Sequence, residues 1–133
     1  MYYFWCMEKR IIKTNNAPAP IGPYNQAVSF GNLLLVSGQI AIDPATGEMK
    51  TGNLTEETEQ VMANIKAVLT EAGMDFSHVL KTSIFLTDMG KFSQVNEIYG
   101  RYFSNETAPA RETVQVAALP KGVQVEISVI AGK

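Results

Sequence analysis

Two side chains of opposite charge lie in segments whose composition is typical of β-strands. Arg111 begins the run 111–118 and Glu126 lies within the run 123–130; both runs are rich in strand-forming residues. A guanidinium binds carboxylates through paired hydrogen bonds, and a carboxylate accepts protons from water. A pocket that received both side chains would therefore be a candidate active site.

The connector between these runs, residues 119–122, contains Pro and Gly and predicts an antiparallel hairpin. Because side chains alternate along a strand, Glu126 lies on the more polar face of the second run, and Arg111 shares a face of the first run with Thr113 and Gln115. In this register Glu126 faces about Gln115, which leaves Arg111 roughly 13 Å farther along the sheet. That distance is too long for a simple ion pair. Either each charge has its own structural partner, or the two face a common pocket that another subunit could complete.

The overall composition limits the classes of function. With 133 residues the chain is long enough for one domain with its own core. Its net charge of −2 and pI near 5.4 force no basic face, which disfavours non-specific nucleic-acid binding. Cys6 is the single cysteine and His78 the single histidine, so neither an intramolecular disulfide nor a metal site built on these residue types is expected. No apolar run reaches the roughly 18 residues of a membrane span.

Residues 1–7 differ from the rest of the chain. The opening segment is aromatic but too short for the apolar core of a signal peptide, and no cleavage pattern follows it. Met7 resembles a natural start, so we predict that residues 1–7 are a flexible N-terminal extension and that residues 8–133 form a single domain. The cytoplasm is the expected compartment.

The remaining segments alternate between strand and helix patterns. Two segments carry the apolar stripe of an amphipathic helix that covers a core. Both helices are expected on one face of a mixed sheet, which is an α+β architecture. The expected order is a short strand ending at Ile12, strands 27–30 and 33–37, helix 55–72, strand 79–87, helix 91–103 and the hairpin.

Two strands are apolar without alternation, at residues 33–36 and 84–86. Such strands need cover on both faces, whereas the two helices cover only one face. The other face would leave a large apolar patch on a monomer. We therefore predict a homo-oligomer that packs through the sheet and that places sites between subunits.

Two positions near the first strands are further candidates for a site. The loop 15–24 contains three prolines, which make it stiff enough to hold Tyr24 in place; packing of that tyrosine against the sheet edge is the alternative. Gly38 follows the strand 33–37, where a missing side chain lets another group approach the backbone, although a simple turn would also explain it.

Six segments together resemble, in order and in spacing, the RidA/YjgF family of enamine/imine deaminases. They are 21–27 (IGPYNQA), 36–40 (VSGQI), 81–89 (KTSIFLTDM), 95–99 (VNEIY), 109–111 (PAR) and 125–127 (VEI). The similarity extends from about Lys9 to Ala131, nearly the whole chain. It implies a chorismate-mutase-like α+β fold, a homotrimer with active sites between subunits, and hydrolysis of 2-imino acids such as 2-iminobutanoate and 2-iminopropanoate to 2-oxo acids and ammonia. It implies neither a cofactor nor a metal.

The resemblance also assigns roles to individual residues. Arg111 would bind the substrate carboxylate, and Glu126 would position and activate the attacking water. The remaining pocket residues would be Tyr24 as a wall, Ser37 and Asn96 as polar walls, and Gly38, whose backbone would contact the nitrogen end of the substrate.

Thr113 departs from the family pattern. Many members have a cysteine two residues after the arginine, and a threonine without a nearby base is a poor nucleophile. In the family this position is thought to act largely through its backbone. Thr113 is therefore expected to preserve hydrolysis, while thiol-based regulation by oxidation or chlorination is lost.

Two other functions stay open. A non-catalytic member of the same fold would bind 2-oxo acids or similar metabolites; Arg111 alone suffices for that, whereas hydrolysis also requires Glu126. Replacement of Glu126 by glutamine would separate these two. A nuclease or translation inhibitor, attributed to some relatives, is disfavoured by the acidic pI.

Overall fold

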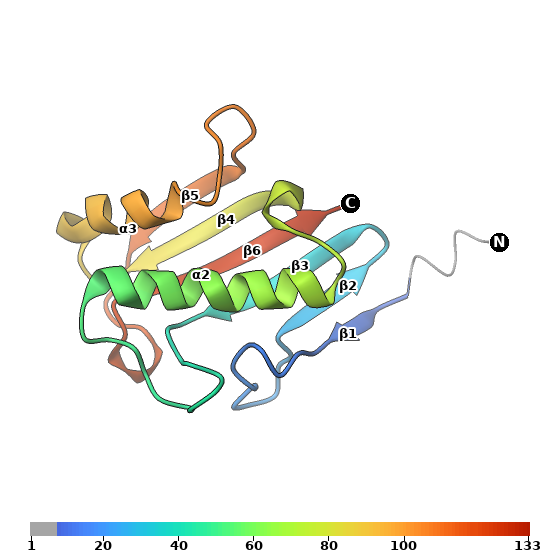
Figure 1. The fold of residues 1–133 in the computed structure, drawn as a ribbon, viewed down its shortest axis with the longest axis horizontal. Coiled ribbons are helices and arrows are strands. Elements are labelled where there is room, and N and C mark those ends of the chain that lie inside the picture. Colours follow the sequence, from blue (N-terminus) through green and yellow to red (C-terminus); the bar gives the residue numbers. More distant parts are fainter. Residues whose placement is uncertain (1–7) are drawn as a thin grey trace.

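The computed structural model describes residues 8–133, so the extension predicted at residues 1–7 lies outside the described part of the chain. Within these residues one six-stranded sheet carries two α-helices, and Figure 1 shows both on the same face of the sheet. The expected α+β architecture is confirmed. The strands are β1 Arg10–Ile12, β2 Ala27–Phe30, β3 Leu33–Gln39, β4 Val79–Leu86, β5 Ala110–Gln115 and β6 Val125–Gly132. The helices are α2 Leu54–Glu71 and α3 Phe92–Tyr99, with short 3-10 helices η1 Phe76–His78, η2 Met89–Lys91 and η3 Pro120–Gly122.

The sheet order is β1-β2-β3-β6-β4-β5, so the predicted hairpin of the last two strands is wrong. β4 lies between them and pairs with β5 in parallel and with β6 antiparallel. The physical reason is burial. Alternate residues of β6 from Val125 to Ala131 are buried, which favours a strand on each side, whereas most of β5 is exposed at the sheet edge. The connector passes the end of β4, where the Val116 N–H donates to the Leu86 carbonyl at 2.8 Å.

The helices form where their apolar stripes predict them. Asn53 caps α2, because its side chain accepts a hydrogen bond from the Glu56 N–H at 2.8 Å. α3 ends at Tyr99, short of the predicted end at residue 103. In the turn that follows, the amides of Arg101 and Tyr102 bond to carbonyls three residues back. The stripe of α2 that packs on the core consists of Val61, Met62, Ile65, Val68 and Leu69.

The face of the sheet away from the helices is apolar and open. Leu35 is in register with Ile130 on one side and with Val28 on the other, so apolar side chains continue across three strands. This is the uncovered face that the sequence predicted. Its large apolar side chains that are between 36% and 48% exposed are Ile11, Phe30, Leu33, Leu35, Val114 and Ile130.

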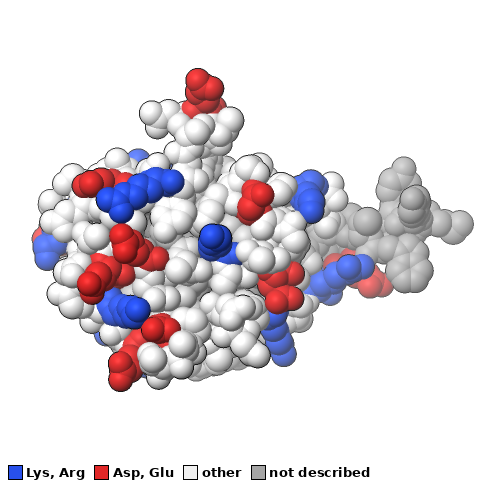
Figure 2. Space-filling view, in the orientation of Figure 1, with Lys and Arg blue, Asp and Glu red and all other residues white. Residues whose placement is uncertain are grey.

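The helix face is polar by contrast. Figure 2 shows Lys and Arg interspersed with Asp and Glu over this side of the molecule. No helix within residues 8–133 combines the length and the apolarity that crossing a membrane requires. Large exposed apolar side chains gather instead on the open face of the sheet.

Candidate active site

Glu126 lies on β6 in the middle of the sheet. Its neighbours Val125 and Ile127 are buried beneath the helices, so the alternation of the strand turns Glu126 to the open face. Partial burial raises the pKa of the Glu126 carboxyl above its ordinary value. A raised carboxyl pKa is better matched to a general base that works near neutral pH.

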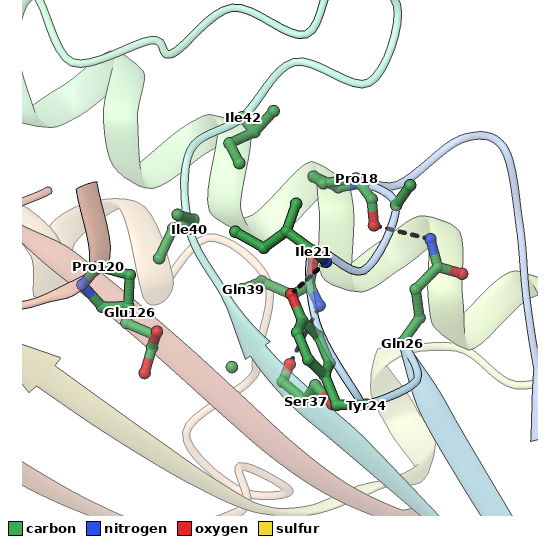
Figure 3. A pocket seen from close by; sticks show the side chains of 12 residues that line it. Pro18, Ile21, Tyr24, Gln26, Ser37, Gln39, Ile40, Ile42, Pro120 and Glu126 are labelled. Carbon is green, nitrogen blue, oxygen red and sulfur yellow. Dashed lines mark hydrogen bonds between the residues drawn. The ribbon is translucent and has the colours of Figure 1, made fainter.

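A pocket of about 410 Å³ opens beside Glu126. Figure 3 shows its side chains converging from the loop before β2, from the end of β3 with the segment after it, and from η3. Tyr24 and Ser37, both predicted as wall residues, line this pocket together with Glu126. The apolar walls include Pro18, Ile21, Ile40, Ile42 and Pro120.

Gly38 lies directly against Glu126. A Cβ atom at position 38 would be 2.7 Å from the carboxyl carbon of Glu126 and 2.8 Å from its Oε2. Contacts this short between non-bonded atoms are repulsive. The group that approaches the backbone at Gly38 is therefore the chain's own carboxylate, and any larger residue at this position would displace it.

Arg111 lies on the edge strand β5 and faces the helices. Its Nη1 donates to Asn96 Oδ1 at 2.7 Å, and its guanidinium carbon is 5.2 Å from the ring centre of Phe92 and 5.0 Å from that of Tyr99. All three partners belong to α3. Burial raises the pKa of Tyr99, whose hydroxyl forms a 2.8 Å hydrogen bond with Thr82 Oγ1. The guanidinium is thus held by neutral groups and keeps its charge for a ligand.

A second hollow, of about 430 Å³, opens beside Arg111. Asn96, Tyr99, Phe103 and Pro109 contribute to its walls. A guanidinium carries five N–H donors, and the bond to Asn96 uses one of them. An anion in this hollow would find free donors on an exposed side chain.

Glu126 and Arg111 do not meet within one copy of the chain. Across β4, Arg111 is in register with Thr82 and Glu126 with Phe85. The two positions therefore differ by two strand spacings, about 10 Å, and by about another 10 Å along the strands. They also project from opposite faces, since Arg111 contacts α3 and Glu126 lies on the open face. One copy does not form the common pocket considered from the sequence.

The candidate residues fall into two groups. We call Tyr24, Ser37, Gly38 and Glu126 the glutamate half-site. We call Asn96, Arg111 and Thr113, which lie on α3 and β5, the arginine half-site.

The sequence of residues 14–133 matches the Endoribonuclease L-PSP family, which includes RidA and YjgF. The chain belongs to this RidA/YjgF family. Protein DfrA of Myxococcus xanthus is 54% identical over 94% of this chain and 96% of its own length. The 2-iminobutanoate/2-iminopropanoate deaminase of Mus musculus is 46% identical over 92% and 90%. The crystal structure of E. coli TdcF with bound serine has a TM-score of 0.87 and 39% identity, over 93% of this chain and 98% of its own. The family predicted from the sequence is confirmed.

In this RidA/YjgF chain, buried amides that sequence reasoning missed hold the pocket walls. Gln26 Nε2 donates to the Pro18 carbonyl at 2.9 Å, as Figure 3 shows. Asn64 Nδ2 donates to the carbonyls of Ile40 and Ile42, each at 3.0 Å. Asn64 had a detectable signal, because it is a polar residue beside the apolar stripe of α2. Gln26 had none, because its partners are backbone groups of a loop, which no sequence pattern marks.

The aromatic partners of Arg111 were also missed. Phe92 and Tyr99 belong to the apolar stripe of the predicted helix 91–103, and Tyr99 is buried there. The same rings also receive the guanidinium. An apolar stripe does not reveal this second role, because the pattern is the same with or without a cation above it.

Thr113 shares with Arg111 the helix-facing side of β5, as the alternation predicted. Its Oγ1 is buried and has no hydrogen-bond partner among the described residues. No base within the described chain therefore activates this hydroxyl through a hydrogen bond. Within residues 8–133, moreover, no group of three or more His, Cys, Asp or Glu is arranged to hold a metal ion.

Proposed function

We propose that this protein hydrolyses 2-imino acids, such as 2-iminobutanoate and 2-iminopropanoate, to 2-oxo acids and ammonia. The pair of half-sites carries the proposal: one offers a cation suited to a carboxylate, and the other offers a carboxylate suited to activating water. Membership of a family that includes a deaminase of this kind supports it.

We further propose that the active site forms between copies in a homotrimer. Glu126 shares the open face of β6 with the exposed Ile130, and a second copy would cover that apolar face. An interface that joins two different surfaces of the same chain produces a closed ring when the rotation between copies closes. A ring of three would contain three equivalent sites, each with an arginine half-site from one copy and a glutamate half-site from the next.

In the proposed complex, Arg111 binds the substrate carboxylate through parallel N–H···O bonds. Asn96 and the two rings of α3 restrict the guanidinium before substrate arrives, which lowers the entropy lost on binding. The carboxylate is then fixed at one end of the site. Its neighbouring imine carbon is presented to the glutamate half-site of the adjoining copy.

Glu126 acts as the general base in the proposed reaction. Water attacks the imine carbon, Glu126 takes a proton from that water, and the proton passes to the nitrogen to give a carbinolamine. Glu126 then takes the carbinolamine hydroxyl proton, which also passes to the nitrogen. The C–N bond breaks as the C=O bond forms, so ammonia and the 2-oxo acid leave and Glu126 is regenerated as a carboxylate.

Mixing two inactive variants tests whether the site is shared between copies. Arg111→Ala and Glu126→Gln are each expected to lose about 10²- to 10⁴-fold in kcat/KM. When equal amounts are unfolded and refolded together, about a quarter of the interfaces combine an intact Arg111 with an intact Glu126. About a quarter of the wild-type activity should then return. Activity is measured as the loss of semicarbazone formation from 2-iminobutanoate that a threonine dehydratase generates.

Each variant refolded alone is the control for this mixture. If the mixture stays as inactive as its components while light scattering shows a trimer, the shared site is wrong. If the folded wild type does not lower semicarbazone formation or release ammonia faster, hydrolysis of this imine is wrong.

A second candidate is a non-catalytic protein that binds 2-oxo acids or related metabolites. The structure of E. coli TdcF favours it, because the bound serine has a carboxylate but no C=N bond. Arg111 would suffice for such binding. Calorimetry with 2-oxobutanoate separates the candidates: Glu126→Gln should keep this binding in either case, and it should lose turnover only if the protein is a hydrolase.

A further inference from the structure

Glu57 is a buried charge that lies outside both half-sites. Among residues 8–133 it is the one charged residue with a buried side chain, at 0% exposure. It lies near the start of α2, and none of the ion pairs found in the described chain includes it. A buried carboxylate without a cation needs hydrogen bonds to offset the loss of water. Its partners therefore indicate its role.

Within residues 8–133, every hydrogen bond of the Glu57 carboxylate goes to Gln124 or Val125, where the chain enters β6. Oε2 accepts from the backbone N–H of Gln124 at 2.7 Å and from that of Val125 at 3.0 Å. Oε1 accepts from Gln124 Nε2 at 3.3 Å. Glu126, the proposed general base, is the next residue along the chain.

Gln124 is also tied to the end of β4 and to η2. Its carbonyl accepts from the Thr87 N–H at 3.1 Å, and its Oε1 accepts from Lys91 Nζ at 3.1 Å. The chain here passes from η3, whose Pro120 lines the pocket, into the centre of the sheet. The segment 120–126 contributes both of its end residues, Pro120 and Glu126, to the pocket wall. Glu57 anchors this segment from the helix side of the sheet.

We propose that Glu57 is a positioning residue that holds Glu126 in its catalytic place through the backbone of Gln124 and Val125. The inference rests on the proposed imine hydrolysis, which gives Glu126 its role. Glu57 contacts β6 from the helix side while Glu126 projects from the open face, so the effect passes through the strand backbone. A displacement of the general base by about 1 Å is enough to lower the rate by about 100-fold.

The chemistry of the contact determines which substitutions it tolerates. All three partners of Glu57 are donors, and an ionised carboxylate is an acceptor only. Leucine is similar in size but leaves two backbone N–H groups unsatisfied. Glutamine keeps one oxygen for those N–H groups, and its amide donates to Gln124 once that side chain rotates. Glu57→Leu should therefore disturb Glu126, and Glu57→Gln should largely preserve it.

Steady-state kinetics with 2-iminobutanoate test the proposal. Glu57→Leu should lower kcat about 10- to 100-fold, whereas KM stays within about twofold because Arg111 is unaffected. Glu57→Gln should keep kcat within about threefold of the wild type. Glu56→Leu changes an exposed glutamate in the same turn and is the matched control. A wild-type kcat in Glu57→Leu would overturn the proposal.

A double-variant cycle separates positioning of Glu126 from a general structural role. If Glu57 acts through Glu126, adding Glu57→Leu to Glu126→Gln should cause no further loss of kcat. Losses that multiply would overturn the proposal. If Glu57→Leu does not fold, Glu57→Asp replaces it in the cycle; it withdraws the carboxylate by one methylene, and a several-fold loss of kcat is expected.

A measurement that requires no turnover distinguishes failure of the Glu57 proposal from failure of the proposed hydrolysis. If the wild type hydrolyses no imine, the proposed function fails, yet the ¹³C NMR signal of the Glu126 carboxyl still reports its surroundings. A shifted signal and faster amide exchange at Gln124 and Val125 in Glu57→Leu, but not in Glu56→Leu, would support the anchoring. An unchanged signal would overturn it.

Discussion

The two half-sites are built in opposite ways. Glu126 lies on a central strand, partly buried and pressed against the backbone at Gly38. Arg111 lies on the edge strand and is exposed, and side chains of α3 hold it. The carboxylate thus depends on the position of the backbone, whereas the guanidinium depends on contacts between side chains.

This difference separates two kinds of failure. Glu126 is carried by a strand that is paired on both edges. A change that shifts the backbone of this strand also moves the general base, and kcat falls. A guanidinium at an edge retains some freedom, and a bound carboxylate can itself order it. Changes around Glu126 should therefore lower kcat, and changes around Arg111 should chiefly raise KM.

The largest expected effect in this comparison is that of Gly38→Ala. The new Cβ would overlap the Glu126 carboxyl, so the carboxylate must move away from the reacting carbon. We expect kcat to fall by at least about 100-fold. Binding of 2-oxobutanoate, measured by calorimetry, should change little because Arg111 is untouched. Gly52→Ala is the matched control, since a Cβ there meets no atom within 4 Å.

A Gly38→Ala enzyme with wild-type kcat would mean that Glu126 tolerates displacement. In that case the carboxylate would not depend on the backbone, and the contrast between the half-sites would disappear.

The loss of activity at low pH should result from protonation of Glu126 in the glutamate half-site. Glu126 must be ionised to accept a proton, and burial raises its pKa. As pH falls through this raised pKa, kcat/KM should decrease about tenfold per pH unit. The affinity for 2-oxobutanoate should stay constant over the same range, because Arg111 keeps its charge. Parallel losses of rate and affinity would contradict this assignment.

The same pKa shift has a consequence for stability. A carboxyl whose pKa is raised on folding costs stability above the folded-state pKa and costs none below the ordinary pKa of the unfolded chain. Glu126→Gln should therefore raise the thermal midpoint at neutral pH. The difference should vanish in acid, which calorimetric scans at both pH values would show.

A smaller effect is expected from Asn96→Ala in the arginine half-site. The guanidinium loses its 2.7 Å hydrogen bond to Oδ1 but keeps both aromatic rings. We expect KM to rise about 3- to 10-fold, the worth of one hydrogen bond, with kcat nearly unchanged. Gln94→Ala, at an exposed position of the same helix, is the control. A fall in kcat alone would place Asn96 in the chemistry instead of in binding.

The smallest effect is expected from Thr113→Val. The hydroxyl is buried without a partner in the described chain, and valine keeps the branched shape. We expect kcat and KM to stay within about twofold of the wild type. A loss above about tenfold would show that the hydroxyl has a partner across the subunit interface.

Much of the fold could be predicted from the sequence because its signals are local. The apolar stripe of α2 and the cap at Asn53 are both properties of a short segment. The alternation along β6 likewise placed Glu126 on the face opposite to Val125. The hairpin was wrong for the opposite reason: a short connector with Pro and Gly is compatible with a turn and with the crossover that η3 provides.

By itself, the sequence determined the family, the α+β class, the helices, and the side of its strand to which each candidate residue projects. Only the tertiary structure decided that Arg111 and Glu126 lie on opposite faces of one sheet. It also placed Gly38 against the Glu126 carboxylate, and Glu57 against the backbone N–H groups of Gln124 and Val125. The physical reason is that alternation belongs to a single strand. The position of β6 between β3 and β4 instead depends on how all the strands pair with one another, and the pattern within one strand does not contain that information.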